Sequence, residues 1–301
     1  MTPPVALTIA GSDSAAGAGI QADLKTFAAL DVFGASAITA LTAQNTVSVN
    51  GLHRVPPDFV DAQIEAVLGD LRVRAVKTGL LPTAPIIRTV AARAGRGELP
   101  NLVVDPVTVA ASGTRLLDAD AERAYLEQLF KHALVITPNL REAAALLDRP
   151  VTTINEMVGA ARALAETGAS IVVVKGGHLT DDDAVDVVYT DGTARELRAP
   201  RVRTDNVHGT GCTFASAIAA GLARGEEPLR AIESAKDFVT AALRGGAGWR
   251  LGSGSGPLDH FARRRGEALA AHPREPELVT GLKGRHAPTV QPDPGHTGGG
   301  S

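Results

Sequence analysis

Short apolar runs rich in β-branched residues alternate along this chain with longer stretches of helical periodicity, and few folds accommodate that alternation. Four of these runs occupy residues 5–10, 103–105, 134–137 and 171–175. Uninterrupted apolar runs of this length are typical of strands buried on both faces, as in a parallel sheet. The pattern therefore predicts a doubly wound α/β fold, with a mostly parallel central sheet and helices on both faces.

The segments between these runs have the spacing of amphipathic helices. One apolar face comprises Ile20, Leu24, Phe27 and Leu30, and another follows Pro57, a residue favoured in the first turn of a helix. The other predicted helices span residues 83–94, 119–131, 140–148, 155–167, 211–224 and 228–244.

Two segments interrupt the alternation, and the C-terminal part differs in composition. Residues 31–55 predict irregular strands that form a lid or an edge over a cleft, whereas residues 184–199 predict a β-hairpin with its turn at Asp191-Gly192. Residues 262–301 are rich in proline and glycine and have no apolar periodicity. We therefore expect one folded domain over residues 1–261, followed by a disordered tail.

The charge and cysteine content exclude several classes of function. The 30 basic and 33 acidic residues give a net charge of −3, which provides no electrostatic footprint for nucleic acid or anionic lipid. A single cysteine, Cys212, excludes an intramolecular disulfide and a multi-cysteine zinc site. No basic residue precedes Lys25, and no apolar segment has the length of a membrane span. We expect a cytoplasmic protein without nucleic-acid or membrane partners.

The strongest local motif is the segment 208–213, His-Gly-Thr-Gly-Cys-Thr, which opens a predicted helix of small residues. Gly209 and Gly211 let the backbone approach a ligand closely, and a helix start presents unpaired N–H groups suited to phosphate. The same field is expected to lower the pKa of the Cys212 thiol. The alternative is a glycine-rich turn into a tightly packed helix with an inert cysteine, and the motif alone does not decide between them.

The loop after the first strand contains a weak dinucleotide motif. Gly17-x-Gly19-x-x-Ala22 formally fits the glycine fingerprint, but several residues separate Gly17 from the strand and no acidic residue stands about 20 positions later. Asp23, on the helix that follows, is a candidate ligand contact. A solvated first-turn carboxylate is the simpler role for such a residue.

Polar residues also follow the later strands of the predicted sheet. Asn139 and Glu142 have the spacing of a helix-capping box, although a carboxylate at that position equally suits a hydrated magnesium ion. Asp105 and Lys175 end two other strands, where turn formation and solvent exposure are the simpler explanations. These side chains and the glycine-rich loop are together the parts that phosphoryl transfer requires. His208, beside that loop, is expected to be structural.

These motifs, in this order, resemble the hydroxymethylpyrimidine/phosphomethylpyrimidine kinases of thiamine biosynthesis, which belong to the ribokinase-like superfamily. The resemblance runs from Leu7 to about Phe261. Its quoted segments are residues 10–26, 38–46, 104–107, 136–142, 174–178, 208–213 and 256–261. It implies a ribokinase-like fold, ATP and Mg²⁺ as cofactors, a small pyrimidine as substrate, and a homodimer.

The resemblance implies a role for each matching residue at the two ends of the site. Gln44 is similar to the residue that reads the pyrimidine ring, with Gly11 and Asp23 lining the same pocket. Lys175 and Asn139 match contacts to the nucleotide. The two residues that match the magnesium region are Asp105 and Glu142.

Between these two ends, Gly209, Thr210 and Gly211 match the anion hole that stabilises the transferring phosphoryl group. Cys212 stands where most sugar kinases of the superfamily carry an aspartate base. The implied reactions phosphorylate first an alcohol, which loses a proton, and then a phosphate, which is already anionic. A thiolate base would help the first reaction and repel the second acceptor. We therefore hypothesise that Cys212 acts through hydrogen bonding and its small volume.

The sequence departs from the family pattern in two places. Residues 109–113 lack the lysine that relatives often place before Ser-Gly, which puts in doubt a lysine contribution from that loop. Thr78 and Leu80 stand where relatives often have isoleucine and methionine, and this difference would adjust the pocket wall.

Three alternatives remain at this point. Pyridoxal kinases share the fold and phosphorylate a similar hydroxymethyl-bearing ring, although Cys212 and Gln44 argue against that activity. The weak glycine fingerprint favours an oxidoreductase. A ligand-binding protein without catalytic activity would bind the pyrimidine without releasing ADP.

Overall fold

The computed structural model describes residues 2–108, 117, 120–177 and 182–271. Its strands are β1 (Val5–Asp13), β2 (Phe33–Gln44), β3 (Val49–Arg54), β4 (Val73–Thr78), β5 (Leu102–Val104), β6 (Val135–Ile136), β7 (Ile171–Lys175), β8 (Asp183–Thr190) and β9 (Thr193–Pro200). Its α-helices are α1 (Gly19–Ala29), α2 (Pro57–Asp70), α3 (Ala84–Gly95), α4 (Ala121–Ala124), α5 (Leu140–Leu147), α6 (Ile154–Ala165), α7 (Thr210–Arg224), α8 (Pro228–Gly246) and α9 (Ala262–Ala271).

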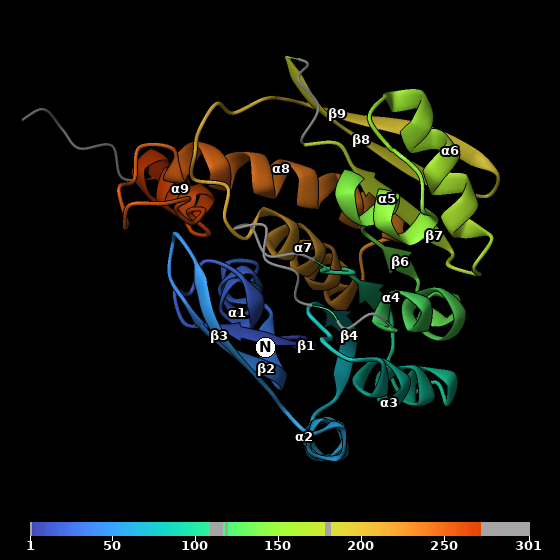
Figure 1. The fold of residues 1–301 in the computed structure, drawn as a ribbon. Helices are drawn as coiled ribbons and strands as arrows, with labels where there is room; N and C mark the ends of the chain where they lie inside the picture. Colours follow the sequence, from blue (N-terminus) through green and yellow to red (C-terminus); the bar gives the residue numbers. More distant parts are fainter. Residues whose placement is uncertain (1, 109–116, 118–119, 178–181, 272–301) are drawn as a thin grey trace, which may run out of the picture.

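The described strands form one sheet in the order β3-β2-β1-β4-β5-β6-β7-β8-β9 (Figure 1). Strands β2, β1, β4, β5, β6 and β7 are mutually parallel. The outer strands β3, β8 and β9 pair antiparallel to their neighbours. The prediction of a mostly parallel central sheet is therefore confirmed, and the antiparallel pairs lie at its two ends.

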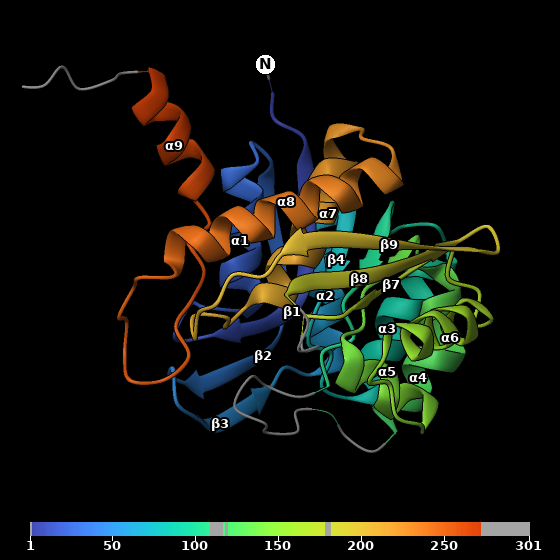
Figure 2. The same cartoon turned by 90° about the horizontal axis from the view of Figure 1, so that it is seen from above.

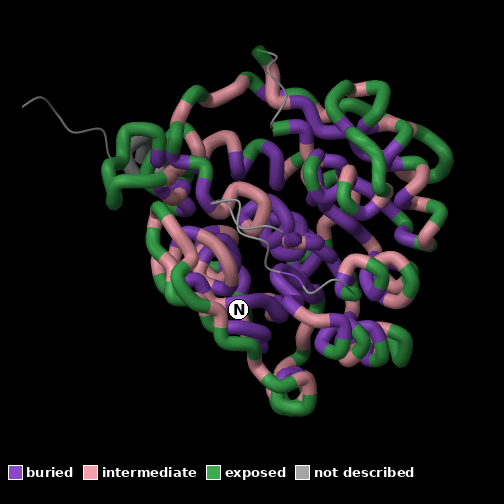
Figure 3. The backbone as a smooth tube through the Cα atoms, in the orientation of Figure 1, coloured by how far each residue is buried: buried purple, intermediate pink, exposed green. Residues whose placement is uncertain are grey.

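Helices cover both faces of the sheet, as predicted (Figure 2). Helices α2, α3, α5 and α6 pack with one buried core, and α1, α7 and α8 pack with the other. Successive strand residues alternate between these two cores, since Val103 belongs to the second and Val104 to the first. The buried backbone accordingly runs through the middle of the molecule, with exposed segments around it (Figure 3).

Most predicted elements are present, with small shifts at their ends. The hairpin β8–β9 turns at Asp191-Gly192, and both residues have positive φ, which suits that tight turn. Strands β2 and β3 occupy the segment expected to be a lid or an edge, and β3 is the edge strand of the sheet. Beyond α4, the predicted helix continues as a π-helical turn, Tyr125–Leu129, and a 3₁₀ turn, Phe130–His132.

Two features differ from the sequence-based expectation. Strand β4 was not predicted, because Arg74, Lys77 and Thr78 break its apolar run. The first part of the expected tail forms helix α9, since residues 262–271 contain helix-favouring alanine, arginine and glutamate and precede the first proline, Pro273. The remaining tail, residues 272–301, lies outside the described residues. No helix in the described part of the chain combines the length and the apolar character needed to cross a membrane.

Candidate active site

A cavity of about 710 Å³ opens beyond the carboxyl ends of the parallel strands. All but one of the predicted site residues line it. They are Gly11, Gln44, Asp105, Asn139, Glu142, Lys175, Gly209, Thr210, Gly211 and Cys212. Residues from both ends of the sheet therefore meet in one hollow, as expected at the switch point of a doubly wound sheet.

Helix α7 begins at the cavity with uncapped amides. Its N-cap, Gly209, has no side chain to accept a hydrogen bond. The amide of Thr210 donates to the carbonyl of Val207, but no acceptor among the described residues is recorded for the amides of Gly211 and Cys212. Unpaired first-turn amides at a helix start stabilise an anion. The unpaired amides of this helix start are therefore those of Gly211 and Cys212, whereas the Thr210 amide at the centre of the predicted anion hole is paired.

Two loops pack closely together at this helix start, and their contact explains why one carries Gly17 and the other Gly209. Gly209 has a φ of +87°, and a Cβ there would lie 1.9 Å from the carbonyl oxygen of Gly17. A Cβ on Gly17 would lie 2.2 Å from the His208 ring. Gly17 of the weak dinucleotide motif therefore packs the first loop against the 208–211 segment, whereas Gly19 packs against Gly11 of β1.

The same loop leaves no amide cradle for a dinucleotide. The Asp13 carboxylate accepts hydrogen bonds from the amides of Ala15, Gly17 and Ala18 at 2.8, 3.1 and 2.9 Å. A bound pyrophosphate would need such amides for itself. The geometry therefore argues against the oxidoreductase interpretation.

Cys212 differs from the expectation in its acidity. Burial raises the pKa of its thiol to about 11, although the charge of Lys77 opposes that effect. The prediction that the helix start lowers this pKa is therefore wrong, because loss of hydration outweighs the favourable charges. A neutral thiol is a weak general base. Its chemistry fits the hypothesis of a small hydrogen-bonding residue.

Asp105, Lys175 and Glu142 form a charged group on the β5–β7 side of the cavity. The Lys175 ammonium lies 2.7 Å from Asp105 Oδ1, which also accepts from Thr137 at 3.0 Å. Burial raises the pKa of Glu142 to about 7, despite the nearby charge of Lys175. Burial would lower the pKa of Lys175, but Asp105 and Glu142 outweigh it and leave that pKa above its usual value. Two carboxylates thus share one ammonium.

Asn139 and Glu142 also form the capping box that their spacing predicts. The Asn139 side chain accepts from the amides of Arg141 and Glu142 at 2.9 and 3.0 Å, and Glu142 Oε2 accepts from the Asn139 amide at 2.7 Å. The box rigidly places the start of α5 at the cavity wall. The capping and the ligand-binding interpretations are therefore compatible, since both residues also line the cavity.

The residues present suit a hydrated divalent cation better than a protein-only metal cage. No group of three or more His, Cys, Asp or Glu side chains that could hold a metal occurs in the part of the chain that is described. Asp105 and Glu142 nevertheless carry one negative charge more than Lys175 balances when both are ionised. Mg²⁺ typically uses one or two carboxylates together with water and substrate phosphates. The donor set fits that arrangement.

Asp23 does not line the cavity, contrary to the prediction. Its side chain is fully buried and accepts from Thr8 and Ser216 at 2.6 Å each. The ammonium of Lys77, also fully buried, lies 2.9 Å from both of its carboxylate oxygens. A carboxylate with all of these donors is saturated. Asp23 therefore supports the cavity floor from beneath rather than contacting a ligand directly.

Some lining residues were not predicted to be functional. His208 contacts both Asp13 and Gln44, and the only sequence clue to His208 and Asp13 was the position of each beside a glycine-rich motif. Asp186 and Lys236 form a buried ion pair of 2.7 Å in another part of the lining, and no motif marks either residue. The 109–113 loop that lacks the family lysine, and His178 of the 174–178 motif, lie outside the described residues.

Comparison with known proteins decides between the remaining kinase and binding-protein alternatives. The family model described as phosphomethylpyrimidine kinase matches residues 13–259, most of the chain. This chain belongs to the phosphomethylpyrimidine kinase family. The predicted resemblance is thus confirmed, and the match runs from the last residue of β1 to just before α9.

Relatives with curated names support the family assignment. The hydroxymethylpyrimidine/phosphomethylpyrimidine kinase of Rhizobium meliloti is 48% identical over 263 residues, which cover 86% of this chain and 97% of that protein. The chloroplastic thiamine biosynthetic bifunctional enzyme of Arabidopsis thaliana is also 48% identical, but this chain spans only 50% of its length.

Solved structures of two kinases share the fold. A Bacillus subtilis pyridoxal kinase in complex with ADP superposes with a TM-score of 0.82 at 40% identity, covering 87% of this chain and 99% of that one. A phosphomethylpyrimidine kinase from Clostridium difficile 630 superposes with a TM-score of 0.70 at 37% identity, covering 80% and 99%. The fold alone therefore does not separate these two kinase activities, whereas membership of the family makes this chain an ATP-dependent kinase.

Proposed function

We propose that this member of the phosphomethylpyrimidine kinase family phosphorylates 4-amino-5-hydroxymethyl-2-methylpyrimidine with ATP and then phosphorylates the resulting monophosphate to the diphosphate. The observation that carries the proposal is the convergence, in one cavity, of Gln44, the uncapped start of α7 and the Asp105–Lys175–Glu142 group. Such a transfer needs a group that recognises the pyrimidine ring, an anion hole for the transferring phosphoryl group and a cation that contacts the nucleotide phosphates.

In the first reaction, the hydroxymethyl oxygen attacks the γ-phosphorus of ATP. The bond between the γ-phosphorus and the oxygen that bridges it to the β-phosphate breaks, and the hydroxyl proton leaves to solvent or to ADP. The amides of Gly211 and Cys212 stabilise the charge on the transferring group. Lys175 and Asn139 contact the nucleotide phosphates. Asp105 and Glu142 would hold Mg²⁺, which supplies neutralising charge to the triphosphate when bound.

The acceptor end of the cavity supplies substrate recognition. Gln44 and Gly11 contact the pyrimidine, while Leu80, also in the lining, forms part of the pocket wall. In the second reaction the acceptor is a phosphate that carries no proton to remove. A neutral Cys212 thiol avoids repelling that anion, which agrees with a raised thiol pKa.

A coupled ADP-release assay tests this function, with the hydroxymethylpyrimidine, its monophosphate and pyridoxine as separate acceptors and product mass as the readout. We expect ADP release and one added phosphate with each of the first two. Pyridoxine is included because the superposition with a pyridoxal kinase favours that second activity. Turnover of pyridoxine alone would replace the proposed function with that of a pyridoxal kinase.

The family resemblance also supports a homodimer, which sedimentation of the full chain would reveal. The use of ATP fits a cytoplasmic enzyme.

A further inference from the structure

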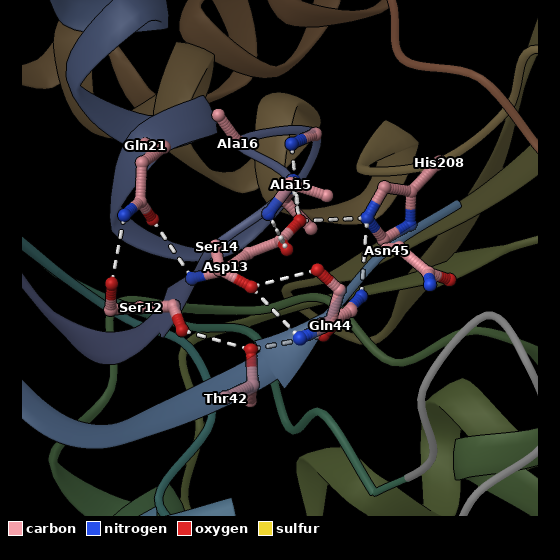
Figure 4. Close-up of polar contacts among 12 residues, drawn as sticks. Ser12, Asp13, Ser14, Ala15, Ala16, Gln21, Thr42, Gln44, Asn45 and His208 are labelled. Atoms are coloured by element: carbon pink, nitrogen blue, oxygen red, sulfur yellow. Dashed lines mark hydrogen bonds and ion pairs between the residues drawn. The ribbon is translucent and has the colours of Figure 1, made fainter. Parts of the chain in front are cut away.

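Three side chains from distant parts of the sequence meet at the acceptor end of the cavity (Figure 4). Asp13 ends β1, Gln44 ends β2, and His208 precedes α7. His208 Nε2 lies 2.8 Å from Asp13 Oδ2 and 3.3 Å from Gln44 Nε2. Asp13 and His208 are buried, whereas Gln44 is half-buried and lines the cavity.

The surroundings of Asp13 fix where the His208 proton lies. Burial would raise the pKa of Asp13, but the hydrogen bonds from His208 and from the amides of Ala18 and Ala15 outweigh it and keep this pKa below its usual value. An ionised carboxylate only accepts hydrogen bonds. His208 Nε2, 2.8 Å away, must therefore carry a hydrogen and donate it to Asp13, whether the ring is neutral or charged.

That proton decides which end of the Gln44 amide faces His208. Two N–H donors 3.3 Å apart cannot satisfy each other, and the amide ends of glutamine are assigned from their hydrogen-bond partners. The consistent arrangement turns the amide over, so that its oxygen shares the single His208 Nε2 hydrogen with Asp13 in a bifurcated hydrogen bond and its nitrogen takes the position 3.2 Å from Thr42 Oγ1. The Thr42 hydroxyl then donates to the Ser12 carbonyl at 3.0 Å, and every donor has an acceptor.

The backbone of Gln44 is held as firmly as its side chain. The backbone N–H of Gln44 donates to Ser14 Oγ at 2.8 Å, and the Ser14 hydroxyl donates back to the backbone carbonyl of Gln44 at 2.7 Å. His208 uses one lone pair of the Gln44 side-chain oxygen, and Thr42 uses one hydrogen of the side-chain NH₂ group. The side-chain amide therefore keeps one acceptor and one donor for a ligand, in a fixed order.

We propose that Asp13 and His208 are positioning residues that lock the Gln44 amide in one orientation, so that the site selects a ring edge with its donor and acceptor in one order. The inference rests on the proposed function. A 4-aminopyrimidine presents an acceptor ring nitrogen beside a donor amine. Its 4-oxo analogue has almost the same shape but presents a donor ring N–H beside an acceptor oxygen.

The test compares kcat/KM for the 4-amino and 4-oxo hydroxymethylpyrimidines, in the wild-type protein and in His208→Phe. We expect the wild type to prefer the amino ring by about 100-fold, because a buried polar group left unpaired is costly. Phe keeps the ring that packs over Gly17 but removes the N–H. The freed amide can then turn over, and we expect the preference to fall to about tenfold or less.

Two further variants separate positioning from a structural effect. His208→Gln keeps a donor toward Asp13 and is expected to retain the preference within about threefold of wild type. The matched control is His260→Phe, which removes another buried histidine, one that contacts Thr213 at 3.1 Å and does not line the cavity. It should leave the preference unchanged even if the melting temperature falls.

The outcomes distinguish this inference from the proposed function. A wild-type protein that turns over neither pyrimidine contradicts the proposed function itself. An active wild type with equal use of both rings, or a His208→Phe variant that loses activity on both rings equally, overturns the positioning role. A His208→Gln variant as unselective as His208→Phe would overturn it as well.

Discussion

Two lysine–aspartate pairs lie beside helix α7, and they differ in what remains available to a ligand. Lys77 and Asp23 are both fully buried, and Thr8 and Ser216 satisfy the carboxylate. In the other pair, Lys175 is 13% exposed and its Asp105 partner is shared with the neighbouring carboxylate Glu142. In the first pair every acceptor position of the carboxylate is used and neither side chain is exposed, whereas the second pair, together with Glu142, has one unbalanced negative charge when both carboxylates are ionised. The two pairs consist of the same residue types, and we propose a part in phosphoryl transfer only for the pair that has charge left for a ligand.

The first prediction concerns the saturated pair. Replacing Lys77 in Lys77→Met leaves the Asp23 carboxylate buried without its counter-charge, so we expect a loss of about 3–5 kcal/mol in the free energy of unfolding. Denaturant unfolding measures it. The double variant Lys77→Met/Asp23→Asn removes the lone charge and should recover part of the loss. A single variant within about 1 kcal/mol of wild type would contradict a structural role for this pair.

The second prediction concerns the cavity pair. We expect Lys175→Met to lower kcat by about 100-fold, because a cation is lost where phosphate charge develops. Its unfolding free energy should change less than that of Lys77→Met, since Lys175 is partly solvated. The exposed Lys131→Met is the matched control and should keep wild-type kcat. If Lys175→Met lost stability but kept its turnover, the two pairs would have exchanged roles.

The third prediction uses the raised pKa of Glu142, about 7 against an ordinary 4.5. Between these values the folded state holds a proton on Glu142 that the unfolded state has released, so the contribution of this group to stability is fully present below pH 4.5 and falls as the pH rises toward 7. We expect Glu142→Gln, which can still form the capping box, to remove a decline on the order of 1–3 kcal/mol. Unfolding of the metal-free protein at several pH values measures this.

A suitable control for this pH series is Glu127→Gln, at an exposed position. It should leave the pH profile as in wild type. An unchanged profile in Glu142→Gln would mean that Glu142 is ionised throughout this range and that burial does not raise its pKa.

The smallest effect is expected at Cys212, whose thiol pKa is affected by charges from both lysine–aspartate pairs. Because burial raises the pKa of its thiol to about 11, we expect Cys212→Ser to lower kcat by less than about tenfold with either the alcohol or the phosphate acceptor. Parallel assays on the two acceptors measure it. A collapse of several hundredfold, about 10²–10³, on the alcohol alone would instead make Cys212 the general base.

The sequence predicted the sheet and most helices because their apolar periodicity is local. It did not predict strand β4, whose Lys77 is buried only because Asp23, distant in the chain, compensates its charge. For the same reason Asp23 was placed in the pocket: its partners Thr8 and Ser216 come from other elements. The family motifs identified the other predicted residues that line the cavity, but not Asp186 or Lys236. A sequence motif identifies which residues occur together, but it does not predict how deeply each side chain is buried.

Burial also explains the errors about acidity and about small networks. The helix start was expected to acidify Cys212, and only the three-dimensional structure reveals the loss of hydration that reverses the shift. His208 was expected to be structural, and it does bind Asp13, but its contact with Gln44 depends on how two glycine-containing loops pack together. Contacts of this kind are not encoded in any single segment.

The most direct test of the mechanism is the kcat of Gly211→Ala. The added methyl group would lie 3.0 Å from the Lys175 ammonium and 3.7 Å from Asp105 Oδ2, at the start of α7 where the amides are unpaired. Since alanine favours helix, the variant should fold as well as wild type, and so should the control Gly159→Ala, whose new methyl group has 4.0 Å of clearance. We expect kcat to fall by about 100-fold in Gly211→Ala alone. Wild-type turnover in that variant would contradict the anion hole at the start of α7.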